Sequence, residues 1–200
     1  MQDHFTGKPT KLCGAQLPNS ESRAALLGSH GERLRALDQL VEIAGQCGIR
    51  SDKDRDFAIL PEDEVSLLEL AGGLWARLGE AIRNFRELLP FIQLDVFGFK
   101  PDGEDVFDEN AHQLVCIGRG VEAMAFQSPD ASIYKFFYFR EGGDIGSSFA
   151  FVRGEEGVIN ATAVPGNYRG LLAKLRLIDQ IGMPTEVLGI TSEGIIVAKQ

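Results

Sequence analysis

Apolar residues recur at spacings of three and four through residues 20–90, which is the period of helices with one buried face. Gly28 and Gly31 predict a break between a short helix and a longer one. Gly72 and Gly73 predict a second break, and Pro90 ends the pattern. The region is therefore expected to form a bundle of three or four helices.

Aromatic, histidine and acidic residues of this region have ordinary structural explanations. Trp75 and Phe85 fall on the apolar stripe, so both are expected in the core rather than in a ligand box. His30 has no partner at a catalytic or metal-ligand spacing, nor has His112 further along, and both are expected to be exposed loop residues. Alternating aspartates at 52–56 suggest a calcium loop, but its required glycine and glutamate positions hold phenylalanine and aspartate. A solvated loop is the better interpretation.

The hydrophobic period changes to two after the helical region. Ile92, Leu94 and Val96 alternate with polar residues, which predicts a strand with one buried face. A turn and an acidic run follow, so a change of architecture is placed near Pro101. The predicted organisation is a flexible arm over 1–19, a helical domain over 20–100 and an α+β domain over 101–200.

Short apolar runs separated by turn residues dominate the last 90 residues. Three strands are expected between 114 and 139, followed by a hairpin over 147–152 and 158–162. A helix is expected over 168–181, and two short strands over 185–191 and 195–199. The fold class is therefore α+β: a helical bundle, then an antiparallel sheet of about five strands with an inserted hairpin and one packed helix.

One stretch of this sheet carries candidate chemistry. Gly118, Arg119 and Gly120 form the turn between the first two strands, and Lys135 lies inside the third. Glycines let backbone N–H groups approach a phosphate and permit positive φ. A lysine in an apolar strand needs a carboxylate, a phosphate or an escape to water. The alternatives are an ordinary hairpin turn and an edge-strand lysine that points to solvent.

The stretch from Leu114 to Phe137 resembles the glycine-rich loop and strand lysine of the protein-kinase superfamily. Gly118 and Gly120 match the first two glycines of that motif, and Lys135 matches the lysine that pairs with the α- and β-phosphates. Alanines stand at the positions of the third glycine and of the valine. The amino-acid sequence of this stretch is most similar to those of divergent kinase-like domains in polyvalent proteins from phages and mobile elements. The resemblance implies ATP as ligand, with Mg²⁺ only where a C-terminal lobe is present.

The chain departs from that family in two ways. The helix over 168–181 contains no glutamate to pair with Lys135, and Glu122, Glu155 and Glu156 remain open as substitutes. No H-R-D or D-F-G string occurs in the 200 residues. Phosphoryl transfer needs a positioned base and metal ions, so the chain is expected to be the N-terminal portion of a kinase-like phosphotransferase, truncated and not catalytic alone. ATP binding by these residues alone is expected to be weak or absent.

Two other interpretations remain open. The chain is alternatively a non-catalytic interaction or scaffold module built on a kinase-like small lobe, whose helical half recruits a protein partner. If the resemblance is accidental, the second half is an unrelated α+β domain, and Lys135 then points to the sheet face opposite the glycine hairpin.

Composition narrows the partners and the compartment. The 44% hydrophobic and 24% charged residues are typical of a folded globular chain. A net charge of -9 disfavours nucleic acid and anionic membranes as partners. The three cysteines are widely spaced and the sequence has no apolar run of membrane-spanning length. The expected partners are a missing C-terminal lobe or another protein, and the expected location is the cytoplasm.

Overall fold

The computed structural model describes residues 20–49, 60, 62–70, 72–99, 114–138, 144–154 and 157–200. Its helices are α1 (Ser20–Gln46), α3 (Glu62–Leu70), α4 (Gly73–Leu88), the 3₁₀ helix η1 (Leu94–Phe97) and α5 (Tyr168–Gln180). Its strands are β1 (Val115–Arg119), β2 (Ala123–Gln127), β3 (Ile133–Phe137), β4 (Ser147–Arg153), β5 (Ile159–Pro165), β6 (Glu186–Ile190) and β7 (Ile196–Lys199). The predicted α+β fold, with a five-stranded antiparallel sheet and a separate hairpin, is confirmed.

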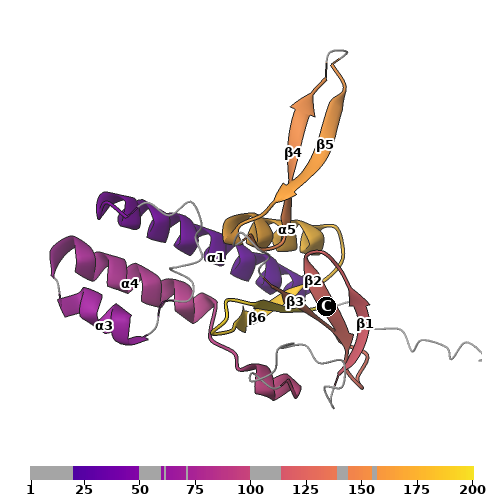
Figure 1. The fold of residues 1–200 in the computed structure, drawn as a ribbon, viewed down its shortest axis with the longest axis horizontal. Helices are drawn as coiled ribbons and strands as arrows, with labels where there is room; N and C mark the ends of the chain where they lie inside the picture. Colours follow the sequence, from indigo (N-terminus) through magenta and orange to yellow (C-terminus); the bar gives the residue numbers. More distant parts are fainter. Residues whose placement is uncertain are drawn as a thin grey trace, which may run out of the picture.

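The helical region packs directly on the sheet region. Helix α1 lies beside α4 and also contacts α5, which covers the sheet (Figure 1). One cluster of buried apolar side chains includes Leu37 and Leu40 of α1, Phe85 of α4, Leu171 of α5 and Ile196 of β7. The two halves of the chain therefore share this core.

Helix α1 is longer than predicted, and the expected break at Gly28 and Gly31 is wrong. The helix runs without interruption from Ser20 to Gln46. A glycine inside a helix costs about 1 kcal/mol, and the packing of α1 against α4 and α5 offsets that cost. The second predicted break is confirmed, since Gly72 precedes α4 with φ of 67° and Gly73, the first residue of α4, has φ of 61°.

Two buried polar side chains of α1 connect the helices to the sheet. His30 is only 1% exposed, so the expectation of an exposed loop residue was wrong. Its Nε2 donates to the carbonyl of Thr185, which directly precedes β6, at 2.8 Å. Arg33 donates from Nε to the Leu88 carbonyl at 2.6 Å and from Nη2 to the Val187 carbonyl at 3.1 Å. These bonds give hydrogen-bond donors to carbonyl groups at the end of α4 and in β6. Without Arg33, the carbonyls would lose their hydrogen bonds to water on folding and gain no donor in exchange.

The segment after α4 is not the predicted strand. Only Phe91 forms an isolated bridge, with Ile190 of β6, and η1 follows. Leu94 and Phe97 are buried three positions apart, whereas Val96 is 65% exposed. The spacing of three between the buried residues belongs to a 3₁₀ turn, so the apparent alternation was misleading.

The aromatic residues of α4 differ in their surroundings. Phe85 is fully buried as predicted, whereas Trp75 is 37% exposed. Trp75 lies in the first turn of the helix, so placing it in the core was wrong.

The five-stranded sheet has the order β1-β2-β3-β7-β6, and each neighbouring pair is antiparallel. One face carries Phe126 and Phe136, whose rings pack edge to face with Phe99 from the segment after η1. The other face carries Phe137 and Ala198 and belongs to the core that includes α5. Both faces are therefore covered, and residue register in β3 decides which face each side chain occupies.

Close packing explains one glycine of the sheet. A Cβ added to Gly189 of β6 would lie 2.2 Å from the carbonyl oxygen of Pro90. That approach brings the Pro90 carbonyl to the Ile190 N–H at 2.9 Å. The segment after α4 is thereby attached to the outer edge of β6.

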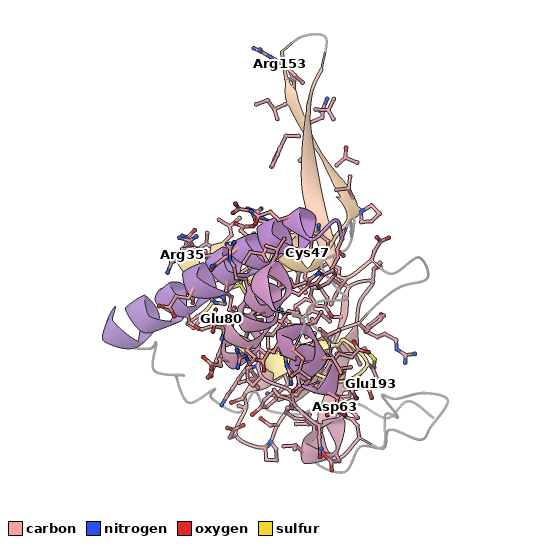
Figure 2. All side chains as sticks on the ribbon, turned by 90° about the vertical axis from the view of Figure 1, so that its left-hand side faces the viewer. Arg35, Cys47, Asp63, Glu80, Arg153 and Glu193 are labelled. Atoms are coloured by element: carbon pink, nitrogen blue, oxygen red, sulfur yellow. The ribbon has the colours of Figure 1, made fainter. Side chains whose placement is uncertain are left out.

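Strands β4 and β5 form a hairpin that projects away from the body of the molecule (Figure 1). Arg153 lies close to its tip (Figure 2). Exposed apolar side chains occur on both strands and beside the tip: Phe151, Val152, Val158 and Ile159.

Several predictions fall on residues outside the described ranges. These are the N-terminal arm, the aspartates at 52–56, His112, Glu155, Glu156 and the acidic run near Pro101. Within the described ranges, no helix combines the length and the apolar character needed to cross a membrane.

Candidate functional site

The predicted site residues line a single cavity of about 570 Å³ between the β1–β2 turn, β3 and α5. Gly118, Arg119, Gly120 and Lys135 all contribute to its wall. Further wall residues come from the turn, the sheet, α5 and the end of the chain: Val121, Glu122, Ala123, Ala125, Phe137, Lys174, Leu175, Ile178 and Gln200. Residues far apart in the sequence therefore meet where the resemblance implies a ligand.

The glycine turn closes the hairpin of β1 and β2. The Gly120 N–H donates to the Ala123 carbonyl at 2.9 Å, and the Tyr138 hydroxyl donates to the Gly120 carbonyl at 2.8 Å. Neither Gly118 nor Gly120 has positive φ, so the turn does not use the left-handed backbone that glycine permits. A Cβ on Gly118 would meet no atom within 4 Å. The space beside Gly118 is therefore available to a ligand rather than filled by the fold.

Lys135 lies on the cavity face of β3. Ala125 of β2 and Ala198 of β7 are its neighbours across the sheet. Small neighbours leave room above the sheet, and the half-buried lysine extends among them. Lys135 therefore shares the cavity with the glycine turn and does not point to the opposite face.

The charge of Lys135 is poorly compensated. Burial lowers the pKa of Lys135 from its ordinary 10.5, the nearby Lys174 ammonium lowers it further, and the Glu122 carboxylate opposes both effects. Among the ion pairs of the described chain, none includes Lys135. The ammonium group is thus poised to gain free energy from an anion that enters the cavity.

A second lysine reaches the cavity from α5. Lys174 forms an ion pair with Glu122 of the glycine turn, and its Nζ lies 3.4 Å from the hydroxyl oxygen of Ser147. Ser147, the first residue of β4, also donates a hydrogen bond to Glu122. Of the three glutamates left open by the sequence, Glu122 is the one in the described chain, and it pairs with Lys174 rather than Lys135.

The N-terminal cap and the apolar face of α5 position this helix beside the cavity. The Asn167 side chain accepts a hydrogen bond from the Gly170 N–H at 2.8 Å and caps the first turn. Leu171 and Leu175 are buried in the core. Lys174, next to the buried Leu175, lines the cavity wall.

The charges of the wall suit an anion. Arg119, Lys135 and Lys174 outnumber the single acid, Glu122, in a chain whose net charge is -9. A phosphate chain fits this donor set, because ammonium and guanidinium groups form charge-assisted hydrogen bonds with phosphate oxygens. A built site for Mg²⁺ does not fit equally well, since no cluster of three potential metal ligands occurs in the described ranges.

A second cavity, of about 590 Å³, lies between α3, α4 and Phe91. Its charged lining includes Glu69 and Arg83, which pair with each other at 2.8 Å. The Arg86 guanidinium lies 4.0 Å from the centre of the Phe91 ring. This cavity lacks the glycine turn and the uncompensated lysine of the first.

No protein-family model matches the chain, and no curated protein or solved structure matches it either. The function is therefore argued from the cavity itself. Sequence reasoning had found the glycine turn and Lys135, but it had assigned no role to Lys174 or Ser147. The only local signal for Lys174 was its place beside the apolar stripe of α5.

Proposed function

We propose that this chain is the nucleotide-covering portion of a divergent kinase-like phosphotransferase. Gly118, Arg119 and Gly120 cover the phosphates of ATP, and Lys135 binds them. The observation that carries the proposal is the meeting of the glycine turn, Lys135 and α5 around one cavity. The chain holds the phosphates but does not transfer them alone, because it lacks the catalytic-loop and metal-binding motifs.

The arrangement supports phosphate binding more than an ordinary hairpin would. The turn is open above Gly118, and the lysine faces the same space from a neighbouring strand. The phosphates of ATP would supply the negatively charged partner that Lys135 lacks among the ion pairs of the described chain. Bound Mg²⁺ would reduce the repulsion between phosphates, and the residues described here hold the phosphates rather than the metal.

The test measures the ATP affinity of the full-length, gene-encoded protein by isothermal titration calorimetry. Lys135→Ala is expected to remove at least about 90% of the affinity, since a charge-assisted hydrogen bond contributes about 1.5–3 kcal/mol. Lys199→Ala is the matched control, because Lys199 pairs across the sheet with Tyr134 and lies 5.8 Å from the centre of that ring. Equal ATP affinity in wild type and Lys135→Ala would refute the site assignment.

The second candidate function is a non-catalytic binding module. The observation in its favour is that α5 has no glutamate and directs Lys174 to the cavity. The lysine–glutamate pair that the resemblance implies for an active enzyme is therefore replaced by a different arrangement. ATP binding without transfer of the γ-phosphate by the gene-encoded protein would favour the module, and measurable transfer would favour the enzyme.

A further inference from the structure

Two lysines face one cavity from different elements. Lys135 comes from the middle of β3, and Lys174 comes from α5. Burial lowers the pKa of Lys135, and the Lys174 ammonium lowers it further. Like charges that share a cavity are costly unless an opposite charge lies between them.

The acid that reduces this repulsion, Glu122, belongs to the glycine turn. Glu122 follows Gly120 by two residues and binds both Lys174 and Ser147. It therefore connects the turn to α5 and to the base of the β4–β5 hairpin. Glu122 forms an ion pair with Lys174, whereas Lys135 has only the coulombic attraction of the same carboxylate.

This charge count indicates the chemistry of a ligand that suits the cavity. An anion with two or more negative charges, placed between Lys135 and Lys174, would compensate both lysines at once. Arg119 also lines the cavity, so its wall carries three positive charges against the one negative charge of Glu122, and a monoanion would offset only half of the excess. The ligand class that satisfies the cavity is a polyphosphate, either free or as the phosphate chain of a nucleotide.

We infer that Lys174 is a second phosphate-binding residue, held by Glu122 in the ligand-free protein and transferred to the phosphate chain when the ligand binds. The inference rests on the proposed phosphate site and deepens it. It differs from the lysine–glutamate pairing that the resemblance implies, because here the helix supplies a cation and the glycine turn supplies the acid. Glu122 is then a positioning residue that competes with the ligand.

A purely structural role makes a different prediction. If the Lys174–Glu122 pair only fastens the turn to α5, removing either partner loosens the turn, and both variants weaken ligand binding. If Lys174 binds phosphate and Glu122 competes with it, the two variants act in opposite directions. The sign of the Glu122→Gln effect therefore separates the two roles.

The experiment measures binding of inorganic tripolyphosphate and of ATP, without Mg²⁺, to the gene-encoded protein by titration calorimetry. Lys174→Met is expected to weaken tripolyphosphate binding about tenfold, comparably to Lys135→Met. Glu122→Gln is expected to tighten binding about two- to fivefold, the range for losing one partly exposed ion pair. Lys199→Met removes the same charge on the opposite sheet face and is expected to change binding little. Thermal unfolding of each variant checks that it is folded.

The outcomes separate this inference from the proposed function. Weakening by Lys174→Met with tightening by Glu122→Gln supports the inference. If Lys135→Met weakens binding but Lys174→Met behaves like Lys199→Met, the inference fails and the nucleotide site stands. If both lysines bind tripolyphosphate but ATP does not bind, the inference stands and the nucleotide proposal fails. Absence of binding by both ligands at millimolar concentration overturns both.

Discussion

Replacing Lys135 with methionine is expected to stabilise the protein while removing phosphate binding. The half-buried ammonium group of Lys135 lines a partly apolar cavity that also contains Lys174, and none of the ion pairs in the described chain includes it. Methionine is also long and unbranched, so it occupies the same space without a charge to desolvate. A ligand-binding residue that costs stability in the empty protein is a known consequence of building a site for an anion.

The size of the gain follows from the partial exposure of Lys135. Burying a polar group without a partner costs about 1–3 kcal/mol in mutational data, and water that still reaches a half-buried ammonium reduces this cost. The expected gain is therefore about 0.5–1 kcal/mol, which corresponds to about 1–4 °C in Tm for a chain of this size.

The gain should depend on pH in a defined direction. Because burial and Lys174 lower the pKa of Lys135 below 10.5, the unfolded chain binds more protons between the lowered pKa and 10.5. The stability of the wild type therefore rises relative to that of the variant as the pH increases through this window. The advantage of Lys135→Met is greatest at neutral pH and fades toward pH 10.5.

Urea unfolding followed by circular dichroism, at neutral and alkaline pH, measures both effects. Lys199→Met is the control. It should not stabilise the protein, because it removes the cation–π interaction between the Lys199 ammonium and the Tyr134 ring. A loss of more than about 1 kcal/mol in Lys135→Met would mean that the ammonium group is already paired in the folded protein, and the argument for an uncompensated lysine would fail.

Three further variants test other parts of the structure. Arg33→Met should lower the free energy of unfolding by about 2–3 kcal/mol, because the buried Val187 carbonyl and the part-buried Leu88 carbonyl lose their donor; a urea-unfolding loss below about 0.5 kcal/mol would contradict the predicted role. Burial lowers the pKa of His30, so wild-type stability should fall as the pH drops below 6.5. His30→Gln should reduce this slope, and an identical slope in the variant would contradict it. Gly118→Val should leave Tm unchanged or higher, since its Cβ meets no atom within 4 Å, yet weaken ATP binding in calorimetry; unchanged affinity would count against phosphate cover.

Much of the sheet was predictable because its signals are local. The run from Leu114 to Phe137 contains its own strands and turns, and β2 and β3 align so that Ala125 lies opposite Lys135. The same locality made the glycine turn and the lysine recognisable as a candidate site. Local patterns therefore sufficed where neighbouring strands pair in sequence order.

The errors occurred where distant packing decides the structure. Ile92, Leu94 and Val96 alternate, but the bridge to β6 and the burial of Phe97 favour η1 instead. Gly31 stays helical because α1 is held between α4 and α5, and neither helix can be located from the α1 sequence.

The contacts of Lys174 were unpredictable for the same reason. Lys174 meets Glu122 across 52 residues of sequence, and Ser147 meets Glu122 across 25. No periodicity or motif connects these positions. Only the packing of α5 over the sheet brings the three side chains together.

The most direct test of the central claim is a structure of the gene-encoded protein with a non-hydrolysable ATP analogue. The account predicts phosphate oxygens within hydrogen-bond distance of the Lys135 ammonium, beneath the turn formed by Gly118 and Gly120. Phosphates bound elsewhere, for example in the cavity between α3 and α4, with the wall around Lys135 unchanged, would contradict it.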